Sequence, residues 1–197
     1  SSFDYSFVLN KLDQNFQPTD GYKSSFSQSL PLISNDYTII NALEYATYKS
    51  FNEDYIFGFN FLFKSANSIN GDDIRASKRL FVPSRRLRGF ESGKIGPVDS
   101  GDYIGGNYIS VLNLSTNLPK LFTEVQNLDF TIFIDSANIW GVDFDSSLDN
   151  SKIRSSTGIA LNWYTPIGPL SFSFAQPITK SSSDVSETFR FDIGTTF

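Results

Sequence analysis

The sequence contains no cysteine, no histidine and no methionine, and these absences exclude whole classes of protein. Without Cys and His, it cannot form a zinc finger, an iron–sulfur site, a His- or Cys-ligated haem, a cysteine protease or a Ser-His-Asp triad. Disulfides are excluded as well, so cysteine usage gives no information on the redox compartment. Because the sequence starts at Ser1 and holds no internal Met, we expect it to be part of a longer chain.

Long hydrophobic runs are also missing. No stretch approaches the roughly 18 to 20 consecutive apolar residues that a membrane helix needs, and the mean hydropathy is only -0.19. Yet the 197 residues include 20 Phe, 9 Tyr and 2 Trp. So many rings in so polar a chain favour either a soluble β core or a lipid-facing β surface.

The aromatic and aliphatic residues alternate with polar ones, which indicates strands with two chemically different faces. In the clearest case Phe189, Phe191 and Ile193 share one face, and Arg190 and Asp192 share the other. No segment shows a helical period, so we predict an all-β fold. We expect about nine strands, several near the 9 to 11 residues of a tilted membrane strand, at 3–13, 22–31, 36–49, 53–64, 104–118, 127–140, 153–165, 168–178 and 187–197.

One connection, 65–103, is far longer than the others, and loops of that size are usually functional or disordered. Seven of the sixteen basic residues lie in its 75–94 segment, where Glu91 is the single acidic residue, although the whole chain carries a net charge of -5. An internal anionic partner is the simplest explanation. The alternatives are a solvated loop near anionic lipid, which we expect for Arg75, Lys78 and Arg79, and, least favoured, a nucleic-acid site.

Several motifs occur together in the second half of the chain. Arg88-Gly89-Phe90-Glu91 is followed by Gly96-Pro97 and Gly105-Gly106-Asn107, and the C-terminal segment carries Ile153-Arg154, Thr157-Gly158-Ile159-Ala160-Leu161, Trp163, Pro166-Ile167-Gly168-Pro169-Leu170, Phe174-Ala175-Gln176-Pro177 and the run from Phe189 to Phe197. Together these segments resemble the BamA family of outer-membrane protein assembly factors, within the bacterial surface antigen superfamily. The resemblance is strong over 80–197 and modest before it.

The resemblance implies an antiparallel meander that forms the C-terminal half of a sixteen-stranded transmembrane β-barrel in the bacterial outer membrane. Residues 1–197 would supply strands eight to sixteen, with 65–103 as a long extracellular loop that enters the lumen. The first seven strands and the periplasmic POTRA domains would lie outside this sequence. A nine-stranded open sheet leaves two unpaired edges, which lipid cannot satisfy.

The resemblance also implies a contact that fixes the loop inside the lumen. In the family, the Arg of the RGF tip binds an Asp on the thirteenth strand, and the matching residues here are Arg88, with Gly89 and Phe90, and Asp135. Strand parity supports this pairing, because an apolar face through Ile132 and Ile134 leaves Asp135 on the opposite, lumenal face. A guanidinium and a carboxylate in a partly desolvated lumen can form a bidentate pair.

The C-terminal strand resembles the β-signal of outer-membrane proteins. Its matching residues are Phe189, Phe191, Ile193, Gly194 and Phe197. In the family this strand pairs weakly with the first strand, and client strands are thought to enter at the resulting lateral seam. Gly194 would loosen the strand, because glycine offers no side chain to pack.

The acidic residues give no convincing catalytic or metal site. Asp143, Asp145 and Asp149 have a spacing that could suggest a calcium loop, but the turn Gly and the closing Glu are missing. We therefore expect no enzyme activity, no metal and no cofactor.

Three functions remain open. The leading one is an assembly factor that folds and inserts β-barrel proteins, with unfolded outer-membrane clients, accessory lipoproteins and outer-membrane lipid as partners and no nucleic acid. The second is a related outer-membrane transporter that secretes one polypeptide through its lumen. The third is a soluble β-sandwich binding module.

Overall fold

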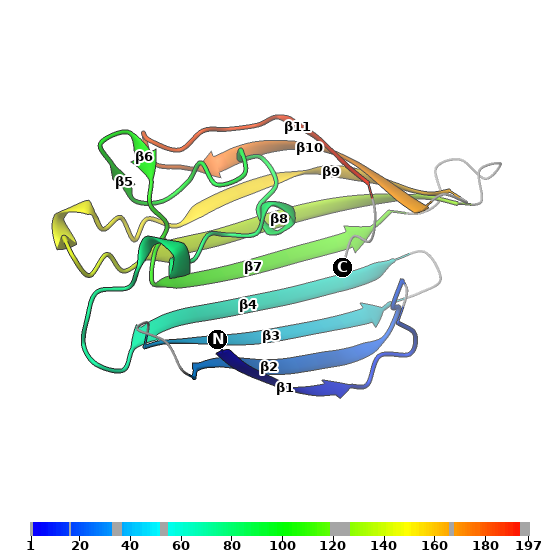
Figure 1. Ribbon diagram of the computed structural model, residues 1–197. Coiled ribbons are helices and arrows are strands. Elements are labelled where there is room, and N and C mark those ends of the chain that lie inside the picture. The colour runs from blue at the N-terminus through cyan, green and yellow to red at the C-terminus, as the bar shows by residue number, and fades with distance from the viewer. Residues whose placement is uncertain are drawn as a thin grey trace.

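Nine strands form one antiparallel sheet in chain order, from β1 at one edge to β11 at the other. The computed structural model describes residues 2–15, 17–32, 37–51, 55–118, 127–165 and 168–193. Figure 1 shows the strands following one another across a curved, open sheet. Its strands are β1 (Ser2–Asn10), β2 (Gly21–Pro31), β3 (Thr38–Ser50), β4 (Ile56–Ser68), β7 (Tyr108–Asn117), β8 (Leu128–Trp140), β9 (Arg154–Thr165), β10 (Gly168–Thr179) and β11 (Phe189–Ile193). The predicted all-β meander of nine strands is confirmed.

The two faces of the sheet differ in chemistry, as strand alternation requires. On β8, Ile132 and Ile134 are exposed, whereas Phe133 and Asp135 between and after them are buried. On β11, Phe189, Phe191 and Ile193 are all exposed. We call the face that carries Asp135 the inner face and the face that carries Ile134 the outer face. The outer face thus exposes many apolar side chains, whereas the inner face buries both polar and apolar ones.

The connection between β4 and β7 spans residues 69–107, and we refer to it as the long connection. It contains the 3-10 helices η1 (Ala76–Lys78) and η2 (Ser84–Arg86) and the paired strands β5 (Val98–Asp99) and β6 (Asp102–Tyr103). We expected 65–103, but β4 continues to Ser68 by pairing with β3, and 104–107 precede β7. In Figure 1 the long connection crosses one face of the sheet.

The helical content in the described part of the chain is limited to short 3-10 turns, the third being η3 (Ser146–Leu148) between β8 and β9. Among those residues no helix is long and apolar enough to cross a membrane.

A hydrophobic core lies between the long connection and the inner face. Its buried residues come from the connection (Val82, Leu87, Phe90 and Ile95) and from β4, β7 and β8 (Leu62, Ile109, Val111, Ala137 and Ile139). Full burial of each large apolar side chain stabilises the fold by roughly 1.5 to 3 kcal/mol. The connection is therefore packed against the sheet as part of the core.

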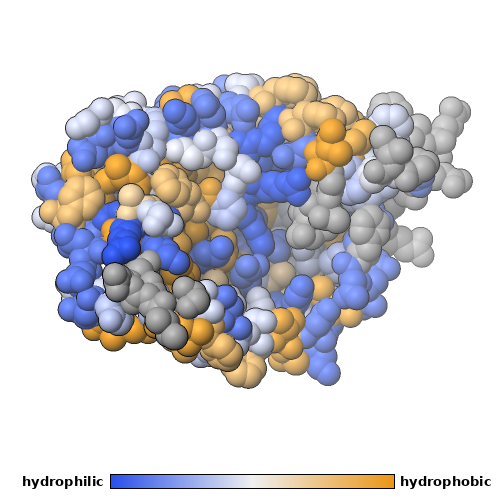
Figure 2. All heavy atoms as spheres, in the orientation of Figure 1, coloured by the Kyte–Doolittle hydropathy of each residue, from blue (hydrophilic) through white to orange (hydrophobic). Residues whose placement is uncertain are grey.

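Apolar residues also remain on the surface, where they belong mainly to the outer face. Figure 2 shows hydrophilic residues in the middle of the side seen in Figure 1, and apolar residues along its lower and upper margins. Exposed apolar side chains occur on most strands, among them Phe7, Leu43, Phe57, Ile134, Ile159, Phe174 and Phe191. An exposed apolar surface this extensive marks a contact with protein or membrane.

Candidate functional site

Arg88 of the long connection and Asp135 of β8 form a bidentate ion pair. Arg88 Nε donates to Asp135 Oδ2 and Arg88 Nη2 to Asp135 Oδ1, both at 2.8 Å. The backbone amide of Arg88 also donates to Oδ2, at 3.1 Å. The Asp135 side chain is 0% exposed and that of Arg88 is 20% exposed. The contact is thus largely removed from solvent. Charge-assisted hydrogen bonds are stronger than neutral ones, and the low dielectric of a protein interior strengthens them further.

The Arg88 guanidinium also lies over an aromatic ring of β8. Its central carbon is 3.3 Å from the centroid of Phe133. Phe133 faces the same way as Asp135, two residues further along the strand, because side chains of a strand alternate with a period of two. One arginine therefore combines a fork of hydrogen bonds with a cation–π contact.

The backbone around Gly89 brings the connection close to β9 and β10. Gly89 has φ of 91°, a conformation that favours glycine. A Cβ at this position would lie 3.0 Å from the Cβ of Ser156 and 3.3 Å from that of Ala175. The Ser156 hydroxyl donates to the carbonyl oxygen of Arg88. Next to it, Phe90 is buried in the core at 2% exposure.

Two polar residues that complete this site were missed by the sequence analysis. Asn113 lies directly opposite Asp135 on β7, and Ser156 lies directly opposite it on β9. Asn113 Nδ2 donates to Asp135 Oδ1 at 2.8 Å and to the Arg86 carbonyl at 2.7 Å. A register prediction across the three strands could have found them. Two residues beyond Asp135, Ala137 keeps regular pairing with Val111 and Arg154.

Arg79 corrects one of our expectations, since we predicted a solvated loop residue and find a buried one. Arg79 is 7% exposed, and its Nη2 donates to Asp143 Oδ1. The amide of Ile74 donates to the other oxygen of Asp143 at 2.6 Å. Burial raises the pKa of Asp143, but hydrogen bonds from Ile74, Asn107 and Arg79 outweigh it and leave that pKa below its ordinary value. An internal partner, not solvent, neutralises Arg79.

The three acidic residues of the β8–β9 connection have different partners. Asp143 binds Arg79, Asp145 accepts from the amide of Ser147 at 2.9 Å, and Asp149 accepts from the amide of Gly141 at 3.1 Å. Each carboxylate therefore serves a separate part of the connection.

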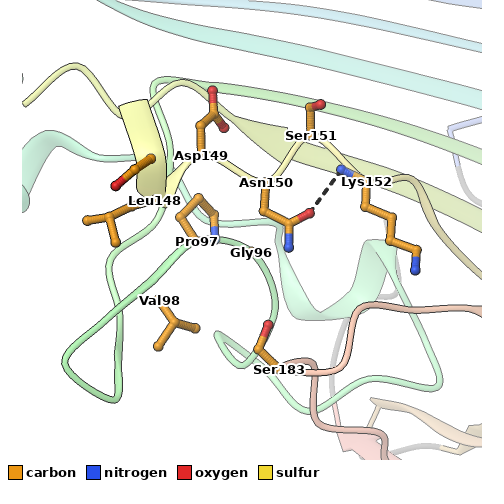
Figure 3. Close-up of a pocket in the computed structure, with 10 residues that line it drawn as sticks. Gly96, Pro97, Val98, Leu148, Asp149, Asn150, Ser151, Lys152 and Ser183 are labelled. Carbon is orange, nitrogen blue, oxygen red and sulfur yellow. Dashed lines mark hydrogen bonds between the residues drawn. The ribbon is translucent and has the colours of Figure 1, made fainter. Parts of the chain in front are cut away.

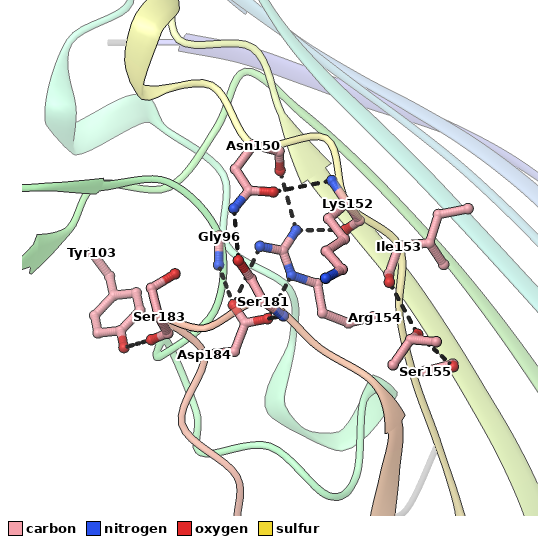
Figure 4. Close-up of polar contacts among 11 residues, drawn as sticks. Gly96, Tyr103, Asn150, Lys152, Ile153, Arg154, Ser155, Ser181, Ser183 and Asp184 are labelled. Atoms are coloured by element: carbon pink, nitrogen blue, oxygen red, sulfur yellow. Dashed lines mark hydrogen bonds and ion pairs between the residues drawn. The ribbon is translucent and has the colours of Figure 1, made fainter.

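A second ion pair, Arg154–Asp184, is completely buried, with both side chains at 0% exposure (Figure 4). Arg154 Nε donates to Asp184 Oδ2 at 3.0 Å, and Nη2 donates to Oδ1 at 3.2 Å. Asp184 also accepts from the amides of Gly96, at 3.3 Å, and Ser181, at 2.5 Å. The pair thus joins β9, the β10–β11 connection and the long connection. Asp184 lies in a run of serines that gave no sequence signal.

A cavity of about 570 Å³ opens beside this ion pair (Figure 3). Its walls come from Gly96, Pro97 and Val98 of the long connection, from the 147–152 segment and from Ser183. The charged groups in these walls are Asp149, which already binds the Gly141 amide, and Lys152. The lining offers polar contacts but no set of groups suited to acid–base chemistry.

Three apolar residues predicted for the C-terminal strand, Phe189, Phe191 and Ile193, lie on the outer face. Phe189 and Phe191 pack beside Phe174 and Phe172 of β10, with ring centroids 5.0 and 4.9 Å apart. Ile193 ends the described part of β11. Gly194 and Phe197 lie outside the described residues.

Comparisons with known proteins point in one direction. A family model described as an Omp85 superfamily domain matches residues 1–197. The outer membrane protein assembly factor BamA of Neorickettsia risticii is 26% identical over 203 residues, covering 100% of this chain and 27% of that protein. The Sorting assembly machinery 50 kDa subunit of Saccharomyces cerevisiae is 29% identical over 212 residues, covering 98% of this chain and 42% of the yeast protein.

A solved structure agrees. The crystal structure of BamA from Haemophilus ducreyi lacking POTRA domains 1–3 superposes with a TM-score of 0.89 at 28% identity, covering 96% of this chain and 41% of that one. The chain therefore spans less than half the length of these relatives.

Proposed function

The chain belongs to the Omp85 superfamily, and from this membership we propose that it forms strands eight to sixteen of a sixteen-stranded barrel in the bacterial outer membrane. The observation that carries the proposal is the agreement of the nine-stranded sheet with a BamA barrel over 96% of the chain. In that barrel the outer face contacts lipid and the inner face lines the lumen. Strands outside this sequence pair with the open edges of β1 and β11.

The activity we propose is the folding and insertion of β-barrel proteins into the outer membrane. The BamA relative that matches the whole chain is named an outer membrane protein assembly factor, and this name supports the proposal. The partners are unfolded outer-membrane protein clients, accessory lipoproteins and outer-membrane lipid, and the process uses no enzymatic step. Energy for insertion comes from the folding of the client, whose strands pair and bury apolar surface.

We assign Arg88, Gly89, Phe90 and Asp135 to holding the long connection, which becomes an extracellular loop, inside the lumen. The bidentate ion pair, the close approach at Gly89 and the burial of Phe90 support this role. A fixed loop keeps the lumen shaped while strands move at its side.

We assign the C-terminal strand to the lateral seam. Phe189, Phe191 and Ile193 face lipid, and Gly194 and Phe197 complete the signal that assembly machinery recognises. Support comes from the position of β11 at the sheet edge and from its exposed apolar side chains.

Depletion of the protein in its own cells tests the function. We expect the folded forms of many outer-membrane proteins to decline together. Loss of a single secreted polypeptide, with outer-membrane proteins unchanged, would instead establish the transporter. Solubility of the full-length protein without detergent would contradict both barrel functions.

A further inference from the structure

The inner face of β11 carries charged residues that touch the long connection. Arg190 and Asp192 alternate with the outward-facing Phe189, Phe191 and Ile193, so they point inward. The Arg190 side chain is only 10% exposed. Its Nη2 donates to the Phe90 carbonyl at 2.5 Å, its Nη1 donates to the Ser84 carbonyl, and its Nε donates to Glu187 Oε2 at 2.8 Å. A strand residue thus satisfies two carbonyls of the connection.

The connection makes a matching contact in the other direction, from Arg85 in η2. Arg85 Nη2 donates to the Ile193 carbonyl at 3.2 Å, and Arg85 Nε lies 3.6 Å from Asp192 Oδ1. The Arg85 and Asp192 side chains are 42% and 26% exposed, so water screens this contact more than it screens Arg190. Arg85 is therefore the more readily released of the two arginines.

The register of β11 shows which side of the strand Arg85 reaches. The Ala175 amide donates to the Thr188 carbonyl at 2.9 Å, which makes these two opposed residues a hydrogen-bonded pair. Such pairs alternate along an antiparallel ladder, so Arg190 and Asp192 use their backbone groups toward β10. The backbone groups of Ile193 consequently point to the open edge, where Arg85 meets the carbonyl.

We propose that Arg85 and Arg190 form a clamp through which the long connection positions the terminal strand, with Arg85 capping the edge carbonyl of Ile193 until a neighbouring strand replaces it. Arg190 is the fixed arm of this clamp and Arg85 the releasable one. Both are positioning residues for strand pairing at the seam. Their contacts are observed independently, but the role of these contacts in strand pairing rests on the proposed function. The connection thereby links the loop inside the lumen to the edge that must open.

Hydrogen exchange in the full-length protein, which includes the strands that complete the proposed barrel, tests the clamp after reconstitution in vesicles of outer-membrane lipid. The variants are Arg85→Glu, Asp192→Arg and the exchanged pair carrying both changes. Lys180→Glu serves as the matched control, because Lys180 is an exposed cation on the neighbouring connection. Heat-modifiable gel mobility establishes that each variant is folded.

We expect Arg85→Glu and Asp192→Arg each to speed exchange in peptides covering 187–193 by about tenfold, as for the loss of a charge-assisted contact near a strand edge. The exchanged pair re-forms the ion pair but not the bond to the Ile193 carbonyl, because a carboxylate cannot donate, so it should restore slow exchange only in part. Lys180→Glu should leave exchange unchanged. Unchanged exchange in Arg85→Glu, or exchange in the pair as fast as in either single variant, would overturn the clamp.

A parallel insertion assay with an unfolded β-barrel client separates this inference from the proposed function. Wild-type vesicles that insert no client would overturn the function while the exchange results still decide the clamp. Arg190→Gln gives a second measure, because it removes the fixed arm and should raise exchange at least as much as Arg85→Glu.

Discussion

Asn113 lies directly opposite Asp135 across the β7–β8 pair, and its amide joins the Asp135 carboxylate to the Arg86 carbonyl. The buried carboxylate is therefore shared between a strand neighbour and the long connection. Asp135 accepts from the amide of Asn113 and from the backbone and side chain of Arg88. A buried charge is tolerated only when it is paired and hydrogen-bonded, and this one is both.

Replacing Arg88 tests the ion pair itself. Arg88→Ala leaves Asp135 buried without its cation, and the loss of one member of such a pair costs roughly 3 to 5 kcal/mol. Arg88→Lys keeps the charge but loses the bidentate fork, so its effect should be smaller. Limited proteolysis of the long connection and client insertion are the measurements. Protease resistance and insertion equal to wild type in Arg88→Ala would remove the proposed role.

Replacing Asn113 separates the network from the charge pair. Asn113→Leu keeps the size of the side chain but removes two donated hydrogen bonds, and we expect a loss of about 1 to 3 kcal/mol. Asn113→Asp should be worse, because it places a second carboxylate beside Asp135. Urea unfolding in detergent micelles measures both. Equal stability of the two variants would show that the Asn113 amide has no electrostatic part in the site.

Replacing Gly89 tests the close approach of backbone to sheet. Gly89→Ala adds a Cβ to a residue with positive φ, within 3.0 Å of Ser156 Cβ. We expect a destabilisation of about 1 to 3 kcal/mol. Gly93→Ala is a matched control, since Gly93 also has positive φ but has no atom within 4 Å of the added Cβ. Gly89→Ala should therefore cost more than Gly93→Ala in the same thermal melt.

The buried pair Arg154–Asp184 predicts strong non-additivity. Asp184→Leu alone leaves a buried guanidinium without its carboxylate, and Arg154→Met alone leaves a buried carboxylate without its cation. Each change should cost roughly 3 to 5 kcal/mol. The double variant removes both charges and should be more stable than either single one. A double-mutant cycle on unfolding free energies checks this. Additive losses would indicate that the two residues act independently.

Asp143 makes stability dependent on pH at the end of the molecule where η3 lies. The pKa of its carboxyl is lower in the folded than in the unfolded state, so its contribution is present above the unfolded pKa, which is near the ordinary value of 3.8. That contribution is lost as pH falls through the folded pKa. The difference in thermal stability between wild type and Asp143→Asn should be constant from neutral pH to about pH 5 and shrink below about pH 4. A difference that does not change with pH would contradict this.

The sheet could be predicted from sequence because its signal is local. Alternation placed Phe189, Phe191 and Ile193 on one face and Asp135 on the other, and burial agrees at each residue. Strand ends follow from pairing more than from local composition. β4 continues beyond the predicted end at residue 64 to Ser68, because its last residues pair with β3.

The site could be predicted only in part. A motif identified Arg88, and parity identified the face of Asp135, but Asp184 lies among serines that resemble any exposed turn. Arg79 was wrongly assigned to solvent, because its partner Asp143 is 64 residues away in the sequence. Contacts of that separation depend on how the long connection crosses the sheet, which no local pattern specifies.

The docking of the long connection has a consequence for the order of folding. Several of its anchors follow it in the chain: Asp135 lies 47 residues after Arg88, Ser156 lies 68 residues after it, and Arg190 lies 100 residues after Phe90. Contacts between residues so distant in sequence form slowly, because the chain between them must first be ordered. During synthesis and translocation the connection emerges before any of these anchors, so these contacts form only after the last strands have followed. A docked connection therefore reports that the C-terminal end of the barrel has been completed.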